Sequence, residues 1–199
     1  MVMFSIAQGA FSANLSVTVT DAAGLPVPDA IVYVEAAAGQ VLPKIAKAAQ
    51  IEQKARKFQP LVTVVQTGSQ VSFPNNDTVR HHVYSFSGPK TFELKLYSGT
   101  PSEPIQFDKP GTVVVGCNIH DQMTAHIRIV DTPYFARTDS SGRARIEGLP
   151  AGKYIVKNWF YKTPEDAQIL AQALTVSSID ISAIFKLDKL SAASSAAAK

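Results

Sequence analysis

The sequence is poor in cysteine and in charge. It has one Cys among its 199 residues, and a lone thiol cannot form a disulfide within the chain. A disulfide-stabilised scaffold is therefore excluded, while the thiol count leaves the cellular compartment undecided. Charged residues make up 18% of the chain, the formal net charge is +3, and no array of aromatic and basic residues is present. This composition argues against nucleic-acid binding, so we expect no nucleic acid among the partners.

Long apolar runs are absent as well. No stretch approaches the roughly 20 residues that a membrane-spanning helix needs, so we expect no integral membrane segment. The first residues, MVMFSIAQGAFSANLS, are apolar and end in small residues, but they begin without Lys or Arg. Both a clipped secretory signal and an ordinary first segment of the fold fit them. Residues 191–199, SAASSAAAK, are predicted to be a disordered tail.

Short alternating segments, in contrast, are abundant. They are rich in Val, Ile, Thr, Tyr and Phe, and turn residues such as Asn75–Asn76 and Gly88–Pro89 separate them. Many short strands at this spacing predict an all-β fold, a β-sandwich or barrel. We expect strands at 15–20, 31–35, 62–65, 70–73, 82–86, 112–115, 127–130, 144–146 and 154–156.

Two segments depart from this alternation. Residues 42–57, LPKIAKAAQIEQKARK, have apolar residues at helical intervals and many Lys and Arg, which fits a helix or a basic loop. Residues 163–174, TPEDAQILAQAL, begin with Thr, Pro and two acids, which is typical of a helix N-terminus. A short helix is therefore predicted in the second segment.

The single cysteine closes one of the predicted strands, in GTVVVGCNIHDQM at residues 111–123. Cys117, His120 and Met123 form the motif C-x-x-H-x-x-M. Thiolate, imidazole and thioether together suit copper better than other common metals, whereas zinc rarely uses methionine. A buried structural cysteine is the simpler explanation of a lone thiol. A Cys–His hydrolase is the other active one, but no further motif supports it.

A type 1 copper site needs a second histidine near the cysteine. The segment FPNNDTVRHHVYSF, residues 73–86, supplies His81 and His82 at the start of a predicted strand. Adjacent strand residues point to opposite faces, so only one of the two is able to reach a metal. His126 lies beyond Met123 on the next predicted strand, and we place it outside the ligand set.

These two segments resemble the cupredoxin family, the small blue-copper proteins that include plastocyanin and amicyanin. The phrase F-x-N-N-x-x-x-x-H is similar to the family's first ligand loop, with Asn75 and Asn76 in its turn. The residue after the first ligand is commonly Asn in that family, and here it is His82. Over residues 58–131 the resemblance implies a Greek-key β-sandwich with one type 1 copper ion. The implied ligands are His81, Cys117, His120 and Met123, with His82 as the alternative to His81.

The remaining sequence resembles the two halves of a carboxypeptidase regulatory-like domain. The first half reads D-x-x-G-x-P-x-x-D-A-x-V from Asp21, and the second reads T-D-x-x-G-x-x-x-I-x-G-L-P-x-G-x-Y from Thr138. This resemblance implies a second, discontinuous small β-sandwich, formed by residues 14–40 and 132–190. The copper module is then an insertion between the two halves.

The cupredoxin resemblance implies a periplasmic or otherwise extracytoplasmic protein that carries single electrons between redox partner proteins. The alternative is copper capture or delivery, or a partner-docking module, without redox turnover. The sequence shows no second metal cluster and no open coordination position, so we expect a protein that is not an enzyme.

Overall fold

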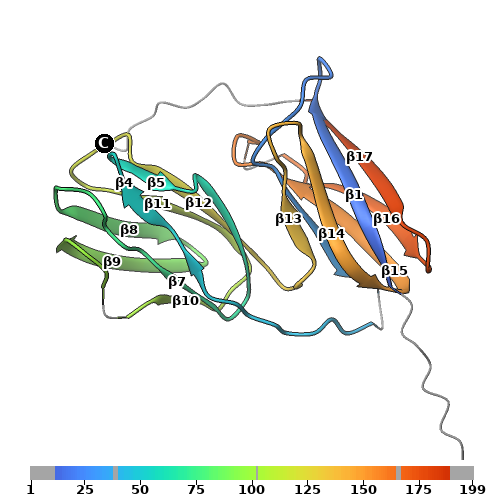
Figure 1. Ribbon diagram of the computed structural model, residues 1–199, viewed down its shortest axis with the longest axis horizontal. Coiled ribbons are helices and arrows are strands. Elements are labelled where there is room, and N and C mark those ends of the chain that lie inside the picture. The colour runs from blue at the N-terminus through green and yellow to red at the C-terminus, as the bar shows by residue number, and fades with distance from the viewer. Residues whose placement is uncertain (1–11, 38–39, 102, 165–166, 189–199) are drawn as a thin grey trace, which may run out of the picture.

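The computed structural model describes residues 12–37, 40–101, 103–164 and 167–188, and every regular element in them is a β-strand (Figure 1). The prediction of an all-β chain is confirmed. The signal-like segment 1–11 and the tail 191–199 lie outside the described residues. Within the described part, the chain has no helix of the length and hydrophobicity that crossing a membrane requires.

The middle of the chain forms one packed unit, which we call the central sandwich. Its larger sheet has five strands and its smaller sheet has three, and a two-stranded hairpin closes one side. The larger sheet is ordered β6 (Val62–Gln66), β12 (Thr124–Val130), β11 (Gly111–Gly116), β8 (His81–Ser87) and β9 (Lys90–Tyr97). The smaller is ordered β10 (Ile105–Phe107), β7 (Ser69–Ser72) and β3 (Ala49–Gln50), and the hairpin pairs β4 (Glu52–Lys54) with β5 (Lys57–Gln59).

Alternation along the strands explains the core of the central sandwich. Ala125, Ile127 and Ile129 of β12 are buried in one apolar cluster, whereas His126 and Arg128 between them lie on the opposite face of the sheet and are partly buried. Val113 and Val115 of β11 enter the same cluster, which also contains Cys117 and Met123. The candidate ligands thus sit at the edge of a packed core and not on a free loop.

The two ends of the chain form a second unit, which we call the flanking sandwich. One sheet is ordered β14 (Arg143–Pro150), β1 (Ser12–Asp21) and β17 (Ile181–Leu187). The other is ordered β13 (Phe135–Arg137), β2 (Ile31–Ala36), β15 (Gly152–Trp159) and β16 (Leu170–Val176). Both sheets bury their inner faces in one apolar cluster that includes Leu15, Leu149 and Phe185.

The short helix predicted at 163–174 is wrong. Leu170–Val176 is strand β16, which pairs antiparallel with β15 from Asn158↔Leu170 to Gly152↔Val176. Tertiary pairing outweighs the local helix signal here, because a neighbouring strand edge is available. Residues 42–57 are not helical either. Residues 42–48 have no regular secondary structure, and the rest form β3, β4 and the turn into β5.

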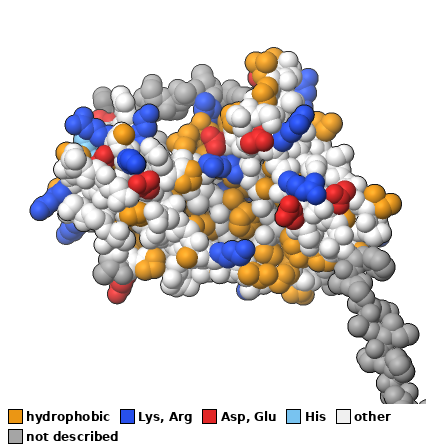
Figure 2. Space-filling model, viewed as in Figure 1, with side chains coloured by type: hydrophobic (Ala, Val, Ile, Leu, Met, Phe, Trp, Pro, Cys, Tyr) orange, Lys and Arg blue, Asp and Glu red, His pale blue; other side chains and the backbone are white. Residues whose placement is uncertain are grey.

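The two sandwiches lie side by side and share an apolar junction (Figure 1). Ile31 and Tyr33 of β2 pack there against Val62 and Val130 of the central sandwich. The Arg128 guanidinium lies over the rings of Tyr33 and Trp159, 5.4 and 5.8 Å from their centroids. Figure 2 shows hydrophobic side chains gathered in the middle of the visible face.

Candidate metal centre

Three predicted ligands meet at one end of the central sandwich. His81, Cys117 and His120 each offer one ligand atom, and these atoms all lie within 4.8 Å of one another. The Cys117 Sγ is 3.8 Å from Nδ1 of His81 and 3.9 Å from Nδ1 of His120. The two rings are 5.0 Å apart between centroids and meet edge to face. Two imidazoles therefore present the same ring nitrogen to one sulfur.

A closed loop holds two of these residues. Strand β11 ends at Gly116, and β12 begins opposite it at Thr124, so residues 117–123 form the connection. Inside the loop, Cys117 N donates to Met123 O at 3.2 Å, and Met123 N donates to His120 O at 2.9 Å. These bonds fold the loop back on itself and place the Met123 and Cys117 backbones side by side. Met123 is 1% exposed and belongs to the core cluster that contains Cys117.

His81 and His82 leave strand β8 on opposite faces. His81 is completely buried and faces Cys117. His82 contacts Glu93 of β9, with Nε2 2.9 Å from Oε1, and its ring lies 5.5 Å from that of Tyr84. The structure thus brings His81 to the cysteine and directs His82 away from it.

His81 also has a carboxylate partner that the sequence reasoning missed. Its Nε2 lies 2.7 Å from Oδ2 of Asp77, in the turn before β8. Burial raises the pKa of Asp77, but hydrogen bonds from the Arg56 amide, His81 and the Ala55 amide together hold that pKa below its usual value. Asp77 is therefore ionised at neutral pH. The only signal in the sequence was an acid four residues before a histidine.

Asn75 fixes the turn that carries Asp77. Its side chain is 3% exposed, and Nδ2 donates to the carbonyls of Val79 and Tyr97 at 2.9 and 2.8 Å. Its Oδ1 accepts the Asp77 amide at 3.0 Å. Close by, Tyr97 Oη donates to the Phe73 carbonyl, and burial raises the pKa of Tyr97 to about 12. The Asn75 side chain thus holds the turn through three hydrogen bonds to backbone groups.

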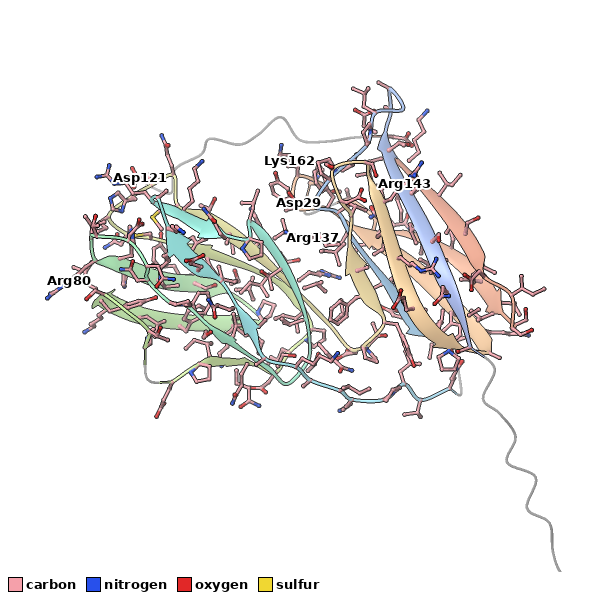
Figure 3. All side chains as sticks on the ribbon, in the orientation of Figure 1. Asp29, Arg80, Asp121, Arg137, Arg143 and Lys162 are labelled. Carbon is pink, nitrogen blue, oxygen red and sulfur yellow. The ribbon has the colours of Figure 1, made fainter. Side chains whose placement is uncertain are left out.

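The open side of the cluster lies around His120. His120 is half-buried, while its neighbours Asn118 and Ile119 are exposed. Figure 3 shows Arg80 and Asp121, next in sequence to His81 and His120, at this end of the central sandwich and far from Arg143 of the flanking sandwich. His126 is not part of the cluster. It lies on β12 with its ring 4.8 Å from that of Tyr161, and burial lowers its pKa.

No protein-family model matches this chain, and no curated protein is similar enough to count as a match. Solved structures with partial similarity include a purple cupredoxin from Nitrosopumilus maritimus, at 20% identity over 41% of this chain and 98% of that one, with a TM-score of 0.36. A reduced amicyanin variant is 20% identical over 41% of this chain and 81% of its own, with a TM-score of 0.37. No match supports the carboxypeptidase regulatory-like resemblance of the flanking segments.

A third similarity corrects one prediction. The Cu-containing nitrite reductase of Thermus scotoductus SA-01 is 22% identical over 56% of this chain, with a TM-score of 0.39, and the chain covers 28% of the reductase. A non-enzymatic protein was predicted because the sequence shows no open coordination position. That prediction is wrong, because a copper enzyme is among the matched structures. A short ligand motif does not show which other residues of a chain contribute to its metal site.

Proposed function

We propose that the chain is a type 1 copper protein that carries single electrons. One copper ion is held by the side chains of His81, Cys117, His120 and Met123. The observation that carries the proposal is the buried convergence of two imidazole Nδ1 atoms on one thiol, 3.8 and 3.9 Å from its sulfur. A thiolate with two imidazoles is the donor set of blue-copper centres, where a thioether is the weak axial ligand.

The fit of these residues to copper rests on their chemistry and their burial. Cys117 and Met123 are 3% and 1% exposed, so both soft sulfur donors are buried away from bulk water. His81 is held from behind by Asp77, which leaves Nδ1 toward the sulfur. When bound, copper supplies a one-electron couple, because thiolate and thioether favour Cu(I) while imidazoles favour Cu(II).

The chain's own contribution is a fixed geometry. His81 begins a strand, and the other proposed ligands lie in a loop closed by two backbone hydrogen bonds. Ligands held in this way move little when the charge at the site changes, which keeps the reorganisation small. His120 is the only half-buried member of the three-residue cluster, so its ring is the direct link between the site and the surface.

The domain plan and the setting are part of the same proposal. Residues 58–131 are the copper domain. Strands β3 and β4 lie just before this range and belong to the same unit, because Ile51 between them enters the central core. Residues 14–40 and 132–190 are the companion domain, whose two halves share one core in the flanking sandwich. We place the protein outside the cytoplasm, in the periplasm, where it exchanges electrons with a redox partner protein.

Visible absorption and electron paramagnetic resonance spectra after one equivalent of Cu(II) test the site. We expect an intense thiolate-to-copper band and narrow copper hyperfine splitting. Cys117→Ser abolishes the colour, Met123→Leu shifts the band, and His81→Gln disrupts the site. His82→Gln is the matched control, and its spectrum stays that of the parent chain. A pale solution with an ordinary tetragonal signal would instead mean that the ligands do not converge on the metal.

Electron exchange separates a carrier from a capture or delivery protein. A carrier exchanges electrons rapidly with a small redox complex and retains copper when a Cu(I) chelator is added. A delivery protein loses Cu(I) to the chelator and exchanges electrons slowly. The burial of Cys117 and Met123 leads us to expect the first result.

A further inference from the structure

The hydrogen bond behind His81 is part of a larger arrangement that reaches the β4–β5 hairpin. His81 is 0% exposed, so an N–H at Nε2 without a partner would carry the full cost of its desolvation. Asp77 Oδ2 meets this nitrogen at 2.7 Å. Both oxygens of this carboxylate also accept backbone amides, so it acts as the acceptor and Nε2 of His81 carries the proton between them. The lone pair on Nδ1 then faces Cys117.

The hairpin turn in turn holds the Asp77 carboxylate. Ala55 N donates to Oδ1 at 2.7 Å, and Arg56 N donates to Oδ2 at 2.9 Å. Two successive amides converge on one anion because both residues are in the left-handed region, with φ of 52° and 55°. A two-residue hairpin with this backbone normally uses Asn-Gly, so Ala-Arg is an unfavourable sequence here. The carboxylate offsets that cost.

The same turn and hairpin are joined at further points. Asn76 N donates to Gln53 O at 2.9 Å, and Asn76 Nδ2 donates to Glu52 Oε1 at 2.6 Å. The Asp77 amide is bound by Asn75, whose side chain also reaches Tyr97. Residues 52–59 and 75–77 are thus one hydrogen-bonded unit with the carboxylate of Asp77 at its centre. This unit contacts the metal site through the hydrogen bond from Asp77 to His81.

We propose that Asp77 is a positioning residue for the metal centre, and that the Ala55–Arg56 turn is its support. Asp77 fixes the ring orientation and the tautomer of His81, and its negative charge beside an imidazole ligand favours Cu(II) over Cu(I). The second of these effects rests on the proposed copper function, whereas the first is a property of the metal-free chain. The hairpin therefore tunes the site without contributing a ligand.

A second His–carboxylate pair provides the matched control. His82 and Glu93 are 2.9 Å apart, close to the 2.7 Å of His81 and Asp77, but His82 lies outside the cluster. Asp77→Asn keeps the size of the side chain and removes its charge, and Glu93→Gln makes the same change beside His82. Only the first variant should alter the site.

The copper measurement is the ratio of Cu(II) to Cu(I) affinity, obtained from the reduction potential. Loss of such a supporting partner typically costs 10–100-fold in metal affinity. For Asp77→Asn we expect Cu(II) affinity to fall at least about 10-fold relative to Cu(I), which raises the potential by about 59 mV or more. Glu93→Gln leaves the potential unchanged, and Asp77→Glu restores part of the shift. Equal potentials for Asp77→Asn and the parent chain would overturn the proposal.

A measurement without copper keeps this proposal separate from the function. In ¹⁵N NMR spectra of the metal-free chain at neutral pH, we expect His81 as the Nε2-protonated tautomer. Asp77→Asn should mix the two tautomers, while Glu93→Gln leaves His81 as it was. If the parent His81 carries its proton on Nδ1, the positioning role is wrong, whatever the copper spectra show. The parent spectrum alone decides this even if Asp77→Asn does not fold.

Discussion

The two sandwiches bury different kinds of residue. Of the ten buried polar or charged residues in the described chain, seven lie between Ala49 and Val130, in the central sandwich. The flanking sandwich buries three, and its core is otherwise apolar. Buried polar groups are costly unless every one is satisfied, and they fix a single arrangement when they are. The comparison indicates that buried polar contacts help to set the geometry of the central sandwich, while the flanking one relies mainly on apolar packing.

Removing a large core side chain from each sandwich gives the largest expected effects. Ile127 and Leu149 are both fully buried, the first in the central core and the second in the flanking core. Each Ala variant should lower the free energy of unfolding by about 2–5 kcal/mol. Only Ile127→Ala should also weaken copper binding, because its core cluster contains Cys117 and Met123.

Guanidinium unfolding, followed through the fluorescence of Trp159 and through copper absorbance, checks both variants. Trp159 is the only tryptophan and lies on β15 of the flanking sandwich. Leu149→Ala should move the fluorescence transition and leave the copper spectrum in native conditions as it is. A changed copper spectrum in Leu149→Ala would show that the flanking core also shapes the site.

Loss of a buried hydrogen-bonding side chain gives the next largest effect, and each sandwich offers one such residue. Asn75 of the central sandwich binds two carbonyls and one amide. Thr138 of the flanking sandwich accepts from Ala30 N at 2.9 Å and donates to Val27 O at 2.8 Å. Replacing either by Ala leaves buried backbone groups unpaired and should cost about 1–3 kcal/mol in unfolding free energy.

The two variants should nevertheless differ in function. Asn75→Ala loosens the turn that carries Asp77, so we expect a broadened copper band and slower electron exchange. Thr138→Ala should keep both properties of the parent chain at equal stability loss. Unfolding curves and copper spectra recorded on the same samples compare the stability loss with the change at the metal site. An unaltered band in Asn75→Ala would mean that the turn does not control the metal centre.

The sequence predicted much of the fold because alternation is a local signal. All nine predicted segments overlap observed strands, from β1 to β15. Among the strands that the sequence did not predict, β9 alternates Glu93 and Lys95 with apolar residues, and Glu and Lys have low strand propensity. The residues of strand β16 predict a helix when taken locally, because the pairing with β15 that makes them a strand is not visible in a local window.

The sequence predicts the ligand residues of the candidate site but not the hydrogen bonds that hold them in place. The residue types and spacing of Cys117, His120 and the His81–His82 pair predict a metal site from the sequence. Asp77 does not, since its role depends on amides of Ala55 and Arg56, about twenty residues earlier in the chain. Which histidine faces the cysteine follows from the register of β8, which a sequence pattern fixes only to within a residue.

The junction between the sandwiches determines whether they unfold together or separately. Arg128 belongs to the central sandwich, and its guanidinium contacts Tyr33 and Trp159 of the flanking one. Arg128→Leu keeps an apolar stem and removes two cation–π contacts, at about 0.5–2 kcal/mol each. We expect the fluorescence and copper transitions, coincident in the parent chain, to separate in this variant. Coincident transitions would mean that the apolar cluster around Val62 and Val130 suffices to couple the sandwiches.

The smallest expected effect is a pH dependence at the same junction. His126 is half-buried against Tyr161, and burial lowers its pKa in the folded chain below the ordinary 6.5. The unfolded chain therefore takes up the proton more readily than the folded chain. Stability from this group is complete above pH of about 6.5 and declines as the pH falls below that value.

Asp77, Asp139 and Asp180, whose pKa values are lowered, affect stability in the same direction but at lower pH. Their stabilising effect is present above pH of about 4 and is lost only as the pH falls below it. Between pH 5 and 7 the slope of unfolding free energy against pH, measured without copper, thus isolates the histidines. His126→Phe keeps a ring against Tyr161 and removes the titration, so the slope should become shallower. An unchanged slope would mean that protonated His126 is accommodated at the junction, and that the two sandwiches are not coupled through its charge.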